Sequence, residues 1–78
     1  MKTFDKTECA RRLRHLRVNV LNVRIDDFAN KVGIGSGTIR HYEHGRCIPG
    51  AWAIFNICVA FGVSADWLLG LEGERNGD

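Results

Sequence analysis

Apolar residues recur at a helical spacing along most of this chain. Between Ile25 and Val32, the side chains of Phe28, Ala29 and Val32 fall on one face of a 3.6-residue period. Gly33 follows directly, and a glycine at this point ends a helix because it adopts the left-handed conformation without a Cβ clash. The pattern therefore predicts a short helix over 25–32.

A second short helix is predicted over Thr38–His44, with Ile39 and Tyr42 on its inner face. Ile34 fills the corner between the two helices. Two helices joined by so short a turn cross steeply, which is the arrangement of a helix-turn-helix. On spacing alone, an ordinary helical hairpin in a small bundle is the alternative.

The first helix of the chain is predicted to run from Thr7, as its N-cap, to about Asn19. Its buried face is expected to consist of Cys9, Leu13, Leu16 and Val20. Its solvent face is expected to carry Arg11, Arg12 and Arg14. The apolar run over 18–23 is interpreted as the frayed end of this helix and a connection, because asparagines interrupt it and no partner strand exists elsewhere.

Two more helices complete the predicted fold. One spans 51–61 and ends at Gly62, and the other lies between Ser64, its N-cap, and Gly70. The core face of the former is expected to consist of Ala51, Ile54, Ile57, Cys58 and Phe61. The fold class is therefore all-α, with five compact helices in one domain over 1–71 and a flexible polar tail over 72–78.

Charge is distributed unevenly along the chain. The net charge is +2, but residues 1–46 carry +5 and residues 47–78 carry −3. The basic part contains the predicted helix-turn-helix, which favours a nucleic-acid partner, although such charges are more often a solvated face.

Composition excludes several other classes of function. The chain has no long apolar run and no basic-then-apolar leader, so we expect a soluble, cytoplasmic protein with no membrane partner. The three cysteines lack a C-x-x-C pair and are expected to be reduced, with Cys9 and Cys58 in the core and Cys47 in a loop. The histidines have no convincing ligand spacing and no nucleophile has a catalytic partner, so we expect no metal, no cofactor and no enzyme.

Four segments together resemble the Cro and CI repressor type (XRE-like) of helix-turn-helix protein. They are RLRHLR, FANKVGI, TIRHYEHG and FGVSADWLLG, within residues 12–70. The resemblance implies a lambda-repressor-like domain that binds operator double-stranded DNA as a homodimer. The function implied is a sequence-specific transcriptional regulator, most simply a dimeric repressor of phage or prophage type on a palindromic operator.

Helical phase and the resemblance assign roles to individual residues. The positions that contact bases are Ser36, Gly37, Arg40 and His41. The positions that contact phosphates are Arg17, Arg24, Ile25, Thr38, Gly45 and Arg46. The resemblance also implies that Arg17 pairs with Glu43, and it places the dimer interface at Trp67, Leu68 and Leu71.

The chain departs from the family pattern at the start of the second helix. Arg24 and Ile25 stand where the family commonly has Ser or Thr followed by Gln, which cap the helix and clamp a phosphate. Gly35 and Gly37 also replace longer polar readers, so specificity is expected to depend more on DNA shape.

A protein-interaction module, such as an antitoxin or an adaptor, is the alternative function. Trp52, Phe55 and Val59 form a second apolar stripe on the helix over 51–61, where a protein partner would dock. The other interpretation of this stripe is that Phe55 belongs to the core and Trp52 alone is partly exposed.

Overall fold

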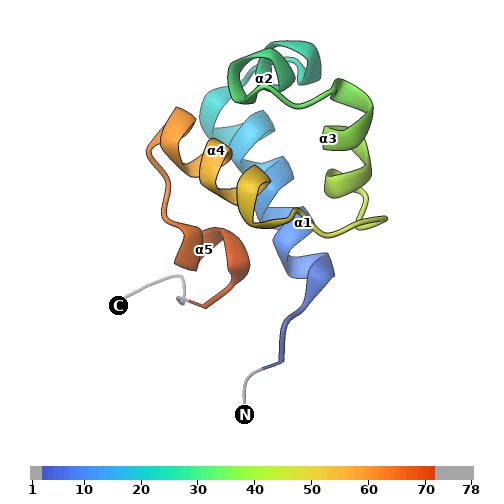
Figure 1. The fold of residues 1–78 in the computed structure, drawn as a ribbon, viewed down its shortest axis with the longest axis vertical. Coiled ribbons are helices and arrows are strands. Elements are labelled where there is room, and N and C mark those ends of the chain that lie inside the picture. Colours follow the sequence, from blue (N-terminus) through green and yellow to red (C-terminus); the bar gives the residue numbers. More distant parts are fainter. Residues whose placement is uncertain (1–2, 72–78) are drawn as a thin grey trace.

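The computed structural model describes residues 3–71, and this part of the chain is all-helical, as predicted. Its elements, shown in Figure 1, are α1 (Lys6–His15), the π-helix η1 (Leu16–Leu21), α2 (Ile25–Val32), α3 (Ser36–Glu43), α4 (Ala51–Phe61) and α5 (Ala65–Leu69). The predicted tail over 72–78 lies outside the described residues. Within 3–71, no helix is long and apolar enough to cross a membrane.

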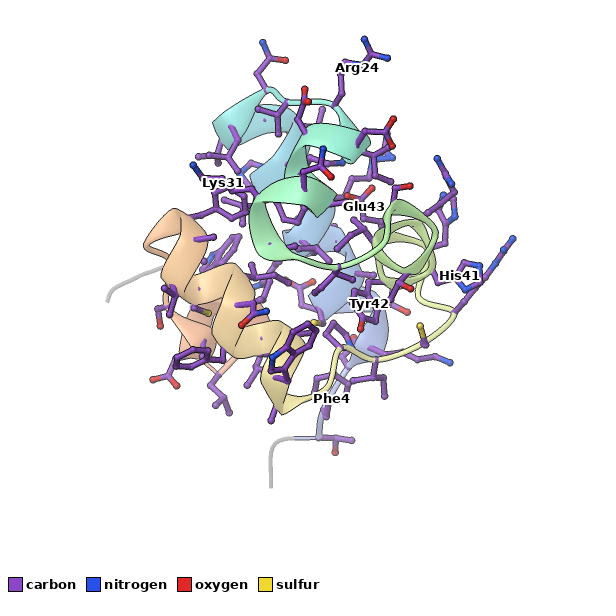
Figure 2. All side chains as sticks on the ribbon, turned by 45° about the horizontal axis from the view of Figure 1, so that its top comes forward. Phe4, Arg24, Lys31, His41, Tyr42 and Glu43 are labelled. Carbon is purple, nitrogen blue, oxygen red and sulfur yellow. The ribbon has the colours of Figure 1, made fainter. Side chains whose placement is uncertain are left out.

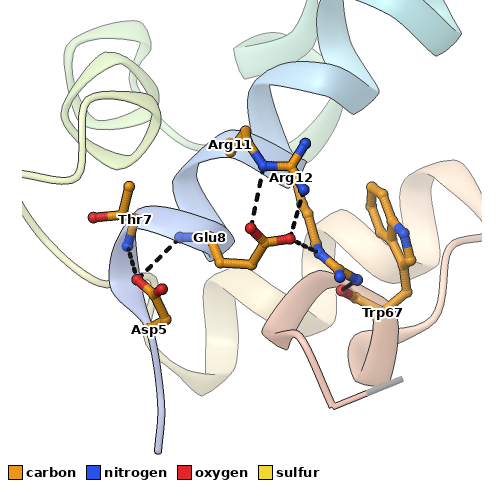
Figure 3. Close-up of polar contacts among 6 residues, drawn as sticks. All are labelled: Asp5, Thr7, Glu8, Arg11, Arg12 and Trp67. Atoms are coloured by element: carbon orange, nitrogen blue, oxygen red, sulfur yellow. Dashed lines mark hydrogen bonds and ion pairs between the residues drawn. The ribbon is translucent and has the colours of Figure 1, made fainter. Parts of the chain in front are cut away.

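Helix α1 begins earlier than predicted, because Asp5 and not Thr7 is its N-cap. The Oδ1 atom of Asp5 accepts hydrogen bonds from the backbone N–H groups of Thr7 at 2.9 Å and Glu8 at 3.3 Å (Figure 3). A carboxylate at this position also interacts favourably with the positive end of the helix dipole.

The first helix does not fray after α1 but widens into η1. A π-helix closes i to i+5 hydrogen bonds, so apolar side chains in it come into phase at a wider spacing than in an α-helix. Leu16 is fully buried and Leu21 packs against the core, whereas Val20 is 61% exposed. The prediction that Val20 is buried was wrong, because the α-helical period does not continue through this segment. Asn22, with φ of 53°, ends the π-helix in the left-handed conformation.

The central helix pair forms as predicted. Helix α2 has the predicted bounds, and Gly33 ends it with φ of 73°. The backbone N–H groups of Gly33 and Ile34 both donate to the carbonyl of Ala29, at 2.9 and 3.1 Å. Helix α3 begins at Ser36, two residues before the predicted start. The pair therefore forms a helix-turn-helix, with α2 packed against α3 (Figure 1).

All five α-helices and η1 contribute to one core. Its buried members are Leu13, Leu16, Phe28, Ala29, Val32, Ile39, Ile54, Ile57 and Leu68. Phe28 stacks on Phe61, with ring centroids 4.7 Å apart. In α4, Ala51 is exposed and Ala53 is buried, which reverses the predicted facing of the first turn.

Helix α5 is held on α1 by a buried arginine. Arg12, predicted to face solvent, is 6% exposed. Its Nε donates to Glu8 Oε2 at 2.6 Å and its Nη1 donates to the Trp67 carbonyl at 2.7 Å (Figure 3). The guanidinium also lies 5.6 Å from the Trp67 ring centroid, a cation–π distance. The prediction for Arg12 was wrong because its partner is 55 residues away, beyond the reach of helical periodicity.

Candidate nucleic-acid interface

The four residues predicted to contact bases share the outer face of α3. Gly37, Arg40 and His41 are exposed and Ser36 is half-buried. Ile39 and Glu43 are buried, where α3 packs against α1 and α2. In Figure 2, His41 lies on the outer side of α3, away from the body of the domain. One exposed helix face is therefore available to enter a DNA groove, as a recognition helix requires.

The N-terminus of α3 is open to a ligand. Its N-cap, Gly35, has no side chain, and no side chain among the described residues caps the helix. The first backbone N–H groups of a helix point outward and carry a partial positive charge. A Cβ atom added at Gly35 or Gly37 would meet nothing within 4 Å, so this end of the helix is sterically open. Thr38, predicted to contact a phosphate, is exposed in the same turn.

Gly45 turns the chain at the end of α3 and thereby places Arg46. Its φ is 71°, in the left-handed region. The N–H of Gly45 donates to the Tyr42 carbonyl at 3.1 Å, and the N–H of Arg46 donates to the His41 carbonyl at 2.9 Å. These two bonds form a Schellman motif. Arg46 is exposed immediately after this fixed turn, one residue beyond the positive-φ glycine.

The start of α2 combines the predicted phosphate contacts Arg24 and Ile25 with acids that sequence reasoning overlooked. Arg24 is the N-cap, with its side chain exposed and no side-chain capping bond, and Ile25 is half-buried. Asp26 and Asp27 follow in the first turn, and both are exposed. Carboxylates here interact favourably with the helix dipole but repel a phosphate at the same amides. Among these side chains, Arg24 alone carries a charge that would attract a phosphate.

The predicted pair between Arg17 and Glu43 is present. Arg17 Nε lies 2.6 Å from Glu43 Oε2, and Arg17 Nη2 lies 3.1 Å from Glu43 Oε1. Arg17 Nη1 also donates to the Val23 carbonyl at 3.0 Å. The hydrogen bond with Glu43 raises the pKa of Arg17 above its usual value. The side chains of Arg17 and Glu43 are 14% and 4% exposed, so the ion pair is largely shielded from solvent.

The residues predicted for the dimer interface do not share one surface. Leu68 is fully buried in the core of the chain, so the expectation that it offers surface to a second copy was wrong. Trp67 is half-buried under Arg12, and its ring centroid lies 6.5 Å from that of His15. Leu71 is 60% exposed. Helix α5 buries Leu68 internally because α1 and α4 pack against it.

The apolar stripe on α4 is fully at the surface. Trp52, Phe55 and Val59 are each about two-thirds exposed. Phe55 is thus not a core residue. A shallow hollow of about 370 Å³ lies beside Phe55 and Val59, and the end of α2 with Asn30 and Lys31 forms its other side.

The cysteines lie where the sequence predicts. Cys9 is buried, Cys58 is half-buried and Cys47 is exposed, and all three are free thiols. Burial raises the pKa of the Cys9 and Cys58 thiols. Within the described part of the chain, no three His, Cys, Asp or Glu side chains gather as a metal site requires.

Comparison with known proteins identifies one family. The sequence-family model described as a helix-turn-helix domain matches residues 10–74, which is most of the chain. No curated protein sequence and no solved structure gives a significant match.

Proposed function

Because the chain belongs to the helix-turn-helix domain family of the XRE type, we propose that it is a sequence-specific transcriptional regulator that binds operator DNA through α3. The family supports DNA binding as the general activity. The proposal adds that the protein binds as a homodimer to a palindromic operator and represses transcription, in the manner of phage and prophage repressors.

The observation that carries this proposal is the open outer face of α3. The base-contacting residues are Ser36, Gly37, Arg40 and His41, because they lie on that face within about two turns of α3. His41 donates to a guanine N7 or O6 atom, and Arg40 contacts either a base or a phosphate. Backbone approach at Gly37 is close because no side chain intervenes.

Phosphate contacts flank this face on both sides. Arg24 and the backbone of Ile25 contact the DNA before α3, and Thr38, Gly45 and Arg46 contact it at and after α3. Such contacts supply most of the affinity and fix the register of the protein, while base contacts add discrimination. Arg17 acts mainly by positioning α3 through Glu43, because three of its five N–H groups are already engaged.

Repression follows from occupancy. A protein seated in the major groove excludes RNA polymerase from an overlapping promoter. Two copies related by a two-fold axis occupy half-sites about 34–36 Å apart, one helical turn of DNA.

Selection of binding sites from random duplexes, followed by footprinting, tests this proposal. The expected result is a palindromic consensus with two protected half-sites in adjacent major grooves. Equal affinity for all duplexes at every salt concentration would contradict sequence-specific binding.

An antitoxin-like or adaptor function is the second candidate, and the exposed stripe on α4 favours it. Trp52, Phe55 and Val59 offer apolar surface that DNA does not use. Binding to a protein partner without any duplex binding would support this candidate over the first.

A further inference from the structure

One face of α4 is apolar, uncharged and exposed. Trp52, Phe55 and Val59 lie at i, i+3 and i+7, and their exposed fractions are 64%, 65% and 67%. None of the three packs in the core of the chain. Contiguous large apolar side chains at the surface mark interaction sites, whereas single exposed ones are ordinary.

We propose that a second copy of this chain covers this face, with the two α4 helices packed antiparallel about a two-fold axis near Phe55. The inference rests on the proposed dimeric function and gives that dimer its interface.

The absence of charge on α4 favours the same surface of a second copy as the binding partner. Residues 47–65, which include all of α4, contain no charged side chain. A two-fold contact brings the same patch of each copy together, so any charge on it would lie near its own like charge. Helix α4 offers neither that repulsion nor an ionic partner for an acidic or basic peptide. Interface cores of stable complexes are depleted of charge in the same way.

The spacing of the three side chains fits an antiparallel pair. When Phe55 lies near the two-fold axis, Trp52 of one copy lies opposite Val59 of the other, and the reverse. The largest side chain thus faces the smallest at both ends of the contact. The hollow of about 370 Å³ borders Phe55 and Val59 on the side of α2 and gives the opposing indole room to seat.

The three side chains supply roughly two-thirds of the area of a small specific interface. The exposed parts of these side chains amount to on the order of 800 Å² across the pair, before neighbouring atoms are counted. Specific interfaces bury from roughly 1,200 Å², so the stripe supplies the apolar centre of such a contact.

Sedimentation of the purified chain without DNA, from low to high micromolar concentration, tests the interface. We expect a concentration-dependent dimer for the wild type and a dissociation constant raised about 30-fold or more by Phe55→Glu, the effect of losing a hot-spot aromatic. Val59→Glu should act similarly. Val20→Glu is the matched control, because Val20 is also exposed but lies in η1, and it should leave the dimer unchanged. A monomeric wild type, or equal effects of Val59→Glu and Val20→Glu, would overturn the proposal.

A charge-swap experiment tests the register. An equimolar mixture of Phe55→Glu and Phe55→Lys should dimerise more tightly than either variant alone, because residue 55 meets its own copy near the axis and opposite charges replace like charges there. A mixture that associates no more tightly than either variant alone would overturn the antiparallel register. Dissociation by Leu71→Asp, with no effect of Phe55→Glu, would place the interface at α5 and overturn the proposal as well.

Binding of each variant to a duplex that carries one half-site separates this inference from the proposed function. Phe55→Glu should keep the half-site affinity of the wild type and lose affinity for the full operator, because its two copies no longer bind as a unit. A wild type that is monomeric but binds half-sites contradicts the interface alone. A dimer that binds no duplex contradicts the function and leaves the interface standing.

Discussion

Arg17 and Glu43 form a two-point, nearly buried ion pair that joins η1 to the end of α3. Because Arg17 also donates to the Val23 carbonyl, the same guanidinium fixes the connection that leads into α2. The orientation of α3 thus depends on a residue in a different helix, 26 positions earlier in the chain.

Replacement of Arg17 by Ala should destabilise the fold severely. The change leaves the Glu43 carboxylate buried without its partner, which costs about 3–5 kcal/mol of the free energy of unfolding. Urea denaturation measures this cost. Replacement of both residues by Met should recover much of the loss, because an apolar pair removes the buried charge. Arg24→Ala is the control, since Arg24 is exposed, and should change stability by less than about 0.5 kcal/mol. A similarly small effect of Arg17→Ala would show that the pair is not structural.

Glu8 should make stability dependent on pH in the acid range. Hydrogen bonds from Arg11 and then Arg12 lower the pKa of Glu8 from 4.5 to about 2. A carboxyl with a lowered folded-state pKa stabilises the protein above its unfolded pKa, and this stability is lost as pH falls through the folded value. The wild type should therefore lose stability between about pH 4.5 and 2 more steeply than Glu8→Gln. Thermal unfolding across this range measures the difference, and identical slopes would contradict the role of Glu8.

Gly37→Ala should have opposite effects on stability and on DNA binding. Gly37 lies in the first turn of α3, and an added Cβ meets no atom within 4 Å, so alanine should stabilise the helix by up to about 0.5 kcal/mol, less than in a helix interior. The same methyl group should weaken operator binding if DNA approaches closely at this position. Thermal unfolding and titration of the operator give the two values. A rise in both stability and affinity would place Gly37 outside the contact.

Arg46→Ala should weaken binding to all duplexes alike and lower the magnitude of the salt slope by roughly one, as expected when one phosphate contact is lost. Arg14→Ala is the matched control. It removes the same formal charge from an exposed site on α1 that has no proposed contact with DNA or with a second copy. Equal salt slopes for the two variants would show that net charge, and not a contact, produces the effect.

Much of the fold follows from the sequence because its helix ends are encoded locally. Gly33, Gly62 and Gly70 each stand directly after an apolar periodic segment, and all three have positive φ as helix-ending residues. The side chain of Ser64 caps α5 through the N–H of Trp67 for the same local reason. Periodicity and end signals agree in these segments, so α2 and α4 have their predicted bounds.

The missed features depend on contacts or geometry that periodicity does not contain. Val20 is exposed because η1 has a wider turn, and the residue that takes its place inside is Leu21. Arg12 is buried because the Trp67 carbonyl accepts its hydrogen bond from another helix. For the site, helical phase predicts which residues share the exposed face of α3. The burial of Leu68 could not be predicted in this way, because it depends on how α5 packs against the other helices.

Affinity measurement on the selected operator with His41→Ala tests the central claim most directly, namely that the outer face of α3 reads bases. The account predicts a loss of about 1–3 kcal/mol and relaxed specificity at one base pair, while binding to random duplexes is unchanged. His15→Ala, an exposed histidine on α1, should leave both affinities unchanged. Equal losses on operator and random DNA, or no loss on either, would contradict base reading by this face.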